Sequence, residues 1–131
     1  MILLDTHALI WQLSNPEKLS PNADQAIEVA INNNEVYVSS ISAWEIAMLV
    51  QRGRLELTMD VKDWLAIAES LQYLHFVPVN NRIAVKSVSL PDFKYADPAD
   101  RIIIATARAL NASLITKDDK ILSYQHVKTI W

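Results

Sequence analysis

Short apolar runs alternate with longer segments of helical periodicity along this chain, and that alternation constrains the fold more than any other feature. Runs with the length and composition of buried strands lie at 2–4, 36–38, 76–79, 113–116 and 127–130. A helical segment or a helical turn separates each run from the next. Strands in such an order pair in parallel through right-handed crossovers. We therefore expect an α/β fold, a three-layer α/β/α sandwich around a mostly parallel central sheet.

Capping and breaking residues set the bounds of the expected elements. Ser20 and Pro21 mark the start of one helix as its N-cap and first residue. Gly53 ends another helix as the residue after its last turn, and Pro78 puts its strand at a sheet edge or a strand end. The last long helix is apolar almost all round and should be buried at the centre. We expect helices at 7–13, 21–31, 43–52, 60–73, 81–88 and 98–110, with a short turn at 119–122.

The composition removes several classes of site. The only glycine is Gly53, which excludes glycine-rich phosphate loops such as the P-loop and the dinucleotide fingerprint. The absence of cysteine excludes disulfides, thiolate catalysis, cysteine-ligated zinc and iron–sulfur clusters. The net charge of −3 argues against nucleic-acid binding through bulk positive charge. It leaves open a nucleic-acid enzyme that works through metal ions.

The length of 131 residues suits one domain, residues 1–131, with a single substantial core. No uninterrupted apolar run is longer than Ile46–Val50, which is too short to span a bilayer. Asp5 follows the first four residues, so a basic region followed by an apolar signal segment does not fit. We expect a soluble, cytoplasmic protein without membrane contact.

Acidic residues follow the expected strands, and an open parallel sheet gathers its sites beyond the carboxyl ends of its strands. Four separate segments each carry such a residue, so each can place a carboxylate at the same edge of the sheet. The acids are Asp5, Glu45, the pair Asp97 and Asp100, and the pair Asp118 and Asp119.

A structural role can explain each of these acids when it is taken alone. Asp5 can be a solvated turn at the end of a strand. Ser42 and Glu45 have the spacing of a capping box, in which the glutamate bonds a backbone N–H. Asp97 and Asp118 can each cap the helix that follows. For any single residue, capping is at least as good an explanation as a functional one.

The set of acids as a whole is harder to explain by capping. Capping needs one polar group per helix anywhere around the domain, not three or four carboxylates at one edge. Crowded carboxylates repel one another, and a bound divalent cation removes that cost. Oxygen ligands without clustered histidine or cysteine favour Mg²⁺ or Mn²⁺ over zinc or copper. The chemistry that fits is hydrolysis of a phosphodiester with the help of metal ions.

Four segments of the chain resemble the PIN-domain ribonucleases, and among them the small VapC-type toxins of type II toxin–antitoxin pairs. The matching segments are LLDTHALIW at 3–11, SSISAWE at 39–45, DPADRIIIATA at 97–107 and LITKD at 114–118. Their order and spacing all fit, and together they extend from Asp5 to Asp118. The resemblance implies a one-domain, metal-dependent endoribonuclease that hydrolyses RNA phosphodiester bonds.

The resemblance also implies roles for individual residues. The acids that match the family's catalytic and metal-ligating positions are Asp5, Glu45, Asp100 and Asp118. Thr6 and Thr116 match hydroxyl positions that support the acidic site. Asp97 matches a motif position, where we expect it mainly to cap and orient its helix. Asp119 is an alternative to Asp118 as the fourth acid.

The cofactor and partners follow from the same resemblance. We expect Asp5 and Asp100 to hold the principal Mg²⁺ or Mn²⁺, with Asp118 and Glu45 completing the pocket directly or through water, whether one or two ions act. The family is typically dimeric, so a homodimer is expected. It is also typically bound by a cognate antitoxin protein, a segment of which covers the active site.

Several neighbouring residues have a simpler interpretation. Lys117 and Lys120 lie close enough to the acids in sequence to touch RNA phosphates, whereas Arg101 is expected to pair with Asp97. A single histidine, His7, is expected to form a hydrogen bond at a helix start rather than to bind metal. Core or interface packing is expected for the tryptophans on apolar stripes, which are Trp11, Trp44 and Trp64.

Other functions fit less well. A receiver-type phosphoacceptor domain would need adjacent acids at the first site and an acceptor aspartate after the strand at 36–38. A haloacid-dehalogenase-like phosphatase would need a second aspartate beside Asp5, where Thr6 and His7 stand. The remaining alternatives are a PIN nuclease that is not a toxin, and a degenerate domain that binds RNA or protein without cleaving. Retention of all four acids favours an enzyme.

Overall fold

Five short strands form one wholly parallel sheet in the computed structural model, which describes residues 1–131. The strand order is β3-β2-β1-β4-β5. The expectation of a mostly parallel sheet is confirmed, and β3 lies at an edge as Pro78 predicted. The strands are β1 (Ile2–Leu4), β2 (Val36–Ser39), β3 (Leu74–Val77), β4 (Ser113–Ile115) and β5 (Thr129–Ile130).

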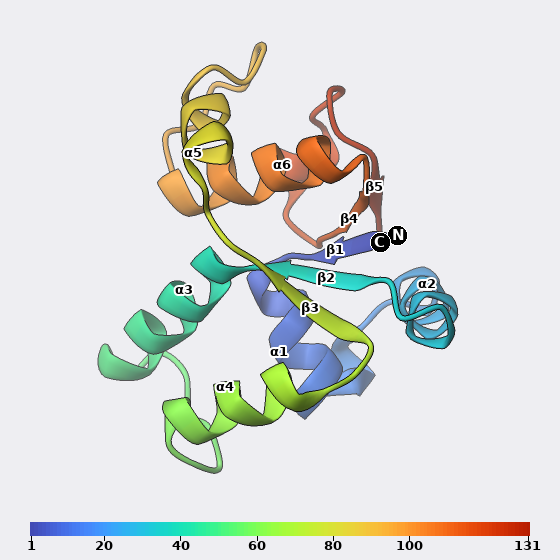
Figure 1. Ribbon diagram of the computed structural model, residues 1–131, viewed down its shortest axis with the longest axis vertical. Helices are drawn as coiled ribbons and strands as arrows, with labels where there is room; N and C mark the ends of the chain where they lie inside the picture. The colour runs from blue at the N-terminus through green and yellow to red at the C-terminus, as the bar shows by residue number, and fades with distance from the viewer.

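Helices cover both faces of this sheet (Figure 1). In Figure 1, α5 and α6 lie above the strands, while α1 and α4 lie below them and α2 stands at one end. Helix α3 leaves the end of β2 and contacts both α4 and α6. None of the helices is long and apolar enough to cross a membrane. The helices are α1 (Thr6–Ser14), α2 (Pro21–Asn32), α3 (Ser40–Gln51), α4 (Val61–Ser70), α5 (Asn81–Val88), α6 (Pro98–Leu110) and α7 (Asp119–Leu122), with one 3₁₀ turn, Pro16–Lys18.

Alternation along the strands produces two separate cores. Ile2 and Leu4 point into a cluster shared with α1, α2 and α4, whereas Leu3 between them packs with α5 and α6. Leu114 and Ile115 of β4 divide between the two clusters in the same way. The sheet is therefore buried on both faces, which explains why its strands read as continuous apolar runs.

Most predicted bounds agree with the structure, and α5 and α6 agree at both ends. The start of α3 was predicted three residues too late. Ser39 Oγ accepts the N–H of Ile41 at 3.2 Å, so Ser39 is the N-cap and the helix begins at Ser40. Helix α4 ends at Ser70, because Leu71 adopts extended backbone and the chain enters β3 at Leu74.

The strand order creates a crevice beyond the carboxyl end of β1. The chain proceeds from β1 to β2 on one side, and then crosses from the β3 edge to β4 on the other side of β1. The connections leaving β1 and β4 therefore diverge over opposite faces of the sheet. Open α/β sheets bind their ligands at such a switch point.

Candidate active site

Asp5 lies at this switch point, directly after β1. Its side chain is 7% exposed. Its Oδ1 accepts the N–H of Thr6 at 2.8 Å, and its Oδ2 accepts the hydroxyl of Thr116 at 2.7 Å. Asp5 is thus the N-cap of α1 and is also tied to the end of β4. Capping accounts for one carboxylate oxygen, so the sequence explanation by a solvated turn is wrong for this buried group.

Thr116 carries the contact onward to the fourth acid. Its buried hydroxyl donates to Asp5 and accepts the N–H of Asp118 at 3.1 Å. Asp118 caps α7 through the N–H of Lys120 and keeps a partly exposed carboxylate at the edge of the site. Asp119 is exposed and forms no side-chain hydrogen bond. Of the two alternatives, the structure brings Asp118 to the site.

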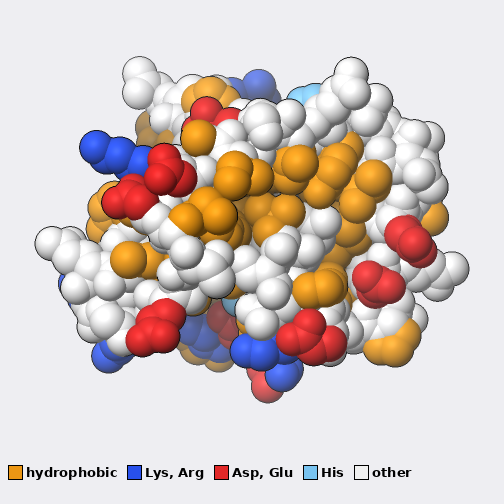
Figure 2. Space-filling view, turned by 90° about the horizontal axis from the view of Figure 1, so that it is seen from below, with side chains coloured by type: hydrophobic (Ala, Val, Ile, Leu, Met, Phe, Trp, Pro, Cys, Tyr) orange, Lys and Arg blue, Asp and Glu red, His pale blue; other side chains and the backbone are white.

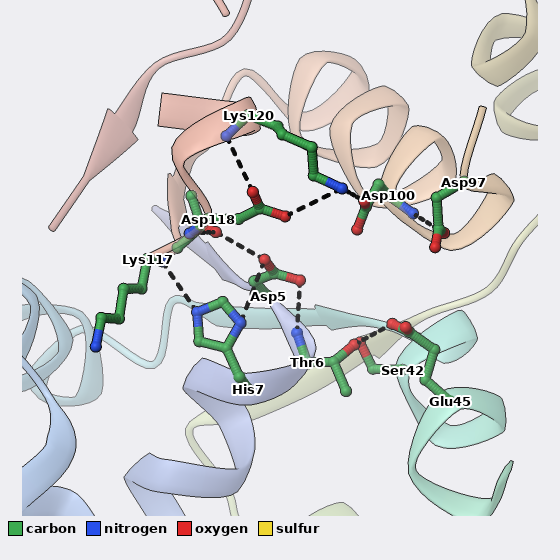
Figure 3. Close-up of polar contacts among 11 residues, drawn as sticks. Asp5, Thr6, His7, Ser42, Glu45, Asp97, Asp100, Lys117, Asp118 and Lys120 are labelled. Carbon is green, nitrogen blue, oxygen red and sulfur yellow. Dashed lines mark hydrogen bonds and ion pairs between the residues drawn. The ribbon is translucent and has the colours of Figure 1, made fainter. Parts of the chain in front are cut away.

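Helix α3 delivers Glu45 to the same edge through a chain of side-chain hydrogen bonds (Figure 3). The hydroxyl of Thr6 donates to Glu45 Oε1 and lies 2.8 Å from the buried hydroxyl of Ser42. Because the single proton of Thr6 goes to Glu45, Ser42 donates to Thr6. Both Ser42 and Glu45 lie inside α3, beyond its N-cap, so the capping-box explanation of Glu45 is wrong.

Asp97 and Asp100 open α6 and divide two roles between them. Asp97 Oδ1 accepts the N–H groups of Ala99 and Asp100 at 2.9 and 3.1 Å, so Asp97 caps the helix as expected. The side chain of Asp100 makes no capping bond. It is 15% exposed and is directed toward the acidic edge (Figure 3).

Lys120 is a cation within this group of acids. Its Nζ lies 3.5 Å from Asp100 Oδ2 and 3.9 Å from Asp118 Oδ2. Its ammonium offsets part of the negative charge at the edge, and these carboxylates, Asp118 first, raise the pKa of Lys120. Sequence reasoning placed Lys120 near RNA phosphates. Its pairing with two acids depends on the path of α7, which no local pattern specifies.

The electrostatics of the site show that the acids are close enough to affect one another. Burial and then the charges of Asp5, Asp100 and Asp97 raise the pKa of Glu45 to about 7, against the lowering effect of its bond from Thr6. Burial and then Asp97 and Asp5 raise the pKa of Asp100 to about 6, although Lys120 opposes this. The ionised forms of these two carboxyl groups are therefore disfavoured, and a nearby cation would stabilise them.

His7 has a larger part than a helix-start hydrogen bond. Its Nε2 accepts the N–H of Lys117 at 2.9 Å, and its Nδ1 lies 3.6 Å from Asp5 Oδ2. The ring therefore connects the first turn of α1 with the loop after β4. Sequence reasoning expected the hydrogen bond but could not place its partner, which is 110 residues away.

Arg101 does not pair with Asp97, contrary to the sequence expectation. Its guanidinium donates to the carbonyls of Tyr95, Ser87 and Phe93 at 2.7, 3.1 and 2.7 Å. These three bonds fasten the end of α5 and the loop after it to the first turns of α6. Arg101 therefore has a structural role, as expected, but through backbone carbonyls.

The donor set suits a hard divalent cation, because the four acids offer only carboxylate oxygens beside two hydroxyls. Each acid is engaged by a donor of the protein itself, and no three acidic or histidine side chains converge tightly enough to share one ion. The raised pKa values of Glu45 and Asp100 mark where added positive charge would be most favourable.

Known proteins are similar to this chain in sequence and in architecture. A family model described as PIN domain matches residues 2–127. Ribonuclease VapC22 from Mycobacterium tuberculosis is 36% identical over 132 residues, covering 99% of this chain and 98% of the relative.

Solved structures agree on the fold. A toxin–antitoxin complex from Klebsiella pneumoniae contains a chain with a TM-score of 0.62 and 21% identity, over 97% of this chain and 95% of that one. VapBC2 from Rickettsia felis, bound to a promoter DNA fragment, gives a TM-score of 0.72 and 19% identity over 98% and 97%. From the matching residues, the relative and the shared architecture, this chain belongs to the PIN-domain family.

Proposed function

We propose that this chain is a metal-dependent endoribonuclease that acts in the cytoplasm as the toxin of a toxin–antitoxin pair. The observation that best supports this proposal is the group of four carboxylates from four segments at the switch point. Two of them, Glu45 and Asp100, have pKa values raised toward neutral pH. The relative that covers nearly the whole chain is named a ribonuclease. The geometry of the site and the sequence similarity to this ribonuclease both support hydrolysis of RNA.

Asp5 and Asp100 would hold Mg²⁺ or Mn²⁺, and Asp118 and Glu45 would complete the pocket directly or through water, which Mg²⁺ usually retains. Such an ion supplies a Lewis acid for the phosphate and lowers the pKa of a coordinated water. The protein's own contribution is orientation. Two protein donors fix both oxygens of Asp5, while Thr6 donates to Glu45 and is itself held by Ser42.

The surrounding chain also excludes bulk water from the inner part of the site. Thr6, Ser42 and Thr116 are buried, so their hydroxyls serve the carboxylates rather than solvent. Lys120 stands at the more open side, where its ammonium is available to exchange a carboxylate for a phosphate oxygen.

An antitoxin partner is supported by the complexes found among the structural neighbours. The face seen from below carries a broad apolar band with charged side chains of both signs around it (Figure 2). A groove of about 640 Å³ on the molecule runs between α1, the loop before α4, and α4 itself, and Leu13, Met59 and Ile67 line it. A segment with apolar side chains and flanking basic residues would suit such a groove.

A second copy of the chain would cover another apolar surface, which we call the α5 surface. Its side chains Val85 and Val88 are 68% and 79% exposed. They lie three positions apart on α5, so they project from neighbouring parts of the same helix face. We include a homodimer in the proposal on this basis.

The test is cleavage of a mixed RNA pool by the purified protein. We expect cleavage with Mn²⁺ or Mg²⁺, none with EDTA, and products with 5′-phosphate and 3′-hydroxyl ends. Asp5→Asn should abolish cleavage, because asparagine keeps the helix cap but removes the charge. Asp60→Asn is the matched control, since Asp60 caps α4 on the surface through the N–H of Lys62. Cleavage that survives EDTA, or survives in Asp5→Asn, contradicts the proposal.

A further inference from the structure

Trp11 lies on α1, one turn after His7, and lines an open cavity beside the acidic edge. Its ring lies 4.9 Å from the ring of His7 and 5.9 Å from that of Trp131, tilted to both. These neighbours hold the indole in one orientation. The side chain is only half-buried. Trp64 behaves differently, since it is 6% exposed and its indole N–H donates to Ser14.

Two lysines lie over the Trp11 ring. Lys117 Nζ is 5.7 Å from the ring centroid and Lys18 Nζ is 5.8 Å from it. Both side chains are exposed, and neither ammonium forms an ion pair with an acid of the chain. Two ammonium groups therefore lie near the Trp11 ring, and no carboxylate of the chain pairs with either of them.

An open cavity joins this ring to the proposed catalytic acids. Its volume is about 400 Å³, and His7, Trp11, Lys117, Asp118 and Asp119 line it. Trp11 is its one apolar wall. The Lys117 side chain is directed away from the carboxylates of Asp5 and Asp118 (Figure 3), so the cavity has an acidic end and a basic end.

His7 contacts both ends of the cavity, the acidic end and the basic end. The ring accepts the N–H of Lys117 at 2.9 Å and faces Asp5 Oδ2 at 3.6 Å, while packing against Trp11. One side chain thus contacts the catalytic edge, the loop that carries Lys117, and the aromatic wall. Trp11 and His7 both lie on α1, which Asp5 caps, so this helix rather than a flexible loop sets the distance from Trp11 to Asp5.

We propose that Trp11 is a stacking platform for one unpaired nucleobase of a single-stranded RNA, with Lys117 and Lys18 meeting the phosphates beside that base. This inference rests on the proposed function and adds to it a contact that holds one base of the substrate beside the acids. Aromatic faces combined with cations are how proteins hold single strands. In duplex RNA the bases are stacked on one another, so none is free to cover the indole. Trp11 therefore has a second role beyond the core packing expected from sequence.

Binding of a short single-stranded RNA tests this directly. The probe is a fluorescein-labelled strand of about ten nucleotides of mixed sequence, bound to the Asp100→Asn protein so that cleavage does not interfere. We expect Trp11→Leu to weaken binding about tenfold, and Trp11→Phe to retain most of the affinity because it keeps an aromatic face. A blunt duplex of the same sequence should bind Trp11→Leu and its parent equally.

The lysines are tested by the salt dependence of the same binding. Lys117→Ala should reduce the slope of log Kd against log salt by about 0.7, the value for one phosphate contact on a single strand. Trp11→Leu should leave the slope unchanged, since stacking releases no counterions. Lys62→Ala, which removes an exposed lysine of α4, is the matched control and should change neither slope nor affinity.

Trp11 also packs against the core, so folding is checked separately. Thermal unfolding of each variant is compared with the parent. If Trp11→Leu is unfolded, Trp11→Phe carries the test: RNA should quench part of the parent's tryptophan fluorescence, and Trp11→Phe should lose that part while still binding. Unchanged RNA affinity in folded Trp11→Leu, or the same quench in Trp11→Phe, overturns the platform.

The two proposals fail in different ways. Trp11-dependent binding without cleavage keeps the platform and removes the nuclease. Cleavage with Trp11-independent binding keeps the nuclease and removes the platform. Absence of both cleavage and single-strand binding removes both.

Discussion

Hydroxyl groups do as much as carboxylates to build this site. Thr6 and Thr116 are both buried, and each links two acids or two segments: Thr6 joins α1 to Glu45, and Thr116 joins Asp5 to Asp118. Carboxylates that must keep their charge near one another need fixed donors, since a mobile carboxylate would turn toward solvent. The positions of the acidic side chains therefore depend on these neutral hydroxyl groups.

Thr116→Val keeps the shape of the side chain but removes its hydroxyl. We expect activity or metal affinity to fall about 10- to 100-fold, as is typical when a group that orients a ligand is lost. RNA cleavage and Mg²⁺ titration measure this. Thr106→Val is the control, because Thr106 is equally buried but bonds only the carbonyl of Ile102 in its own helix. Equal losses in the two variants would assign Thr116 a packing role only.

The raised pKa values of Glu45 and Asp100 make stability depend on pH. Their folded values of about 7 and about 6 exceed the ordinary values of 4.5 and 3.8, so the folded protein keeps protons that the unfolded chain releases. Stability from this source is fully present below about pH 4 and is lost as the pH rises through 6 and 7.

In the metal-free protein, we therefore expect Asp100→Asn to raise the Tm more at pH 8 than at pH 5. Adding Mg²⁺ at pH 8 should raise the Tm of the parent and have less effect on the variant. Differential scanning calorimetry across this range is the measurement, with Asp60→Asn as a surface control. A variant that is stabilised more at pH 5 would contradict the assignment.

At the scale of elements, sequence predicted what local capping determines and missed what distant contacts determine. Helix α6 was predicted correctly at both ends, because Asp97 and Pro98 begin it and Asn111 ends it with left-handed backbone at φ 53°. The start of α3 was missed because Ser39, Ser40 and Ser42 are equally good caps by composition. In the structure Ser39 is the one that caps the helix through the N–H of Ile41, while Ser42 bonds Thr6, 36 residues away.

Arg101 holds the start of α6, where Asp97 and Asp100 lie, against the preceding loop. Arg101→Lys cannot reach three carbonyls at once, because lysine lacks the planar fork of donors. We expect it to lower the free energy of unfolding by about 2 kcal/mol and to reduce cleavage through displacement of Asp100. Urea unfolding measures the first effect. Arg82→Lys, an exposed change on α5, should leave the unfolding midpoint unchanged, and an equally small effect of Arg101→Lys would contradict its anchoring role.

For the molecule as a whole, the alternation of apolar runs and helices was sufficient to predict a parallel sheet and the edge at which the acids meet. It could not predict the strand order, because each strand is apolar on both faces and carries no mark of its neighbour. Nor could it predict the positions of Lys120 or His7, whose partners become neighbours only through that order. Composition therefore indicated the chemistry, while topology determines the contacts.

The α5 surface gives a test of assembly. Val85→Asp combined with Val88→Asp should convert the proposed homodimer to a monomer, because charged side chains at a buried contact would lose their water. Light scattering coupled to size exclusion gives the mass. Val29→Asp is the matched control, since Val29 is 56% exposed on α2. A parent that is already monomeric, or a double variant that remains dimeric, would contradict an α5 interface.

The bond between Thr116 and Asp5 spans 111 residues, and β4 is the second neighbour of the central strand β1. On the ribosome, β1 emerges first but cannot be completed until β4 follows. Until then Asp5 can cap α1 but lacks the Thr116 hydroxyl that fixes its Oδ2. The group of acids at this edge is therefore assembled only after nearly the whole sheet has been synthesised.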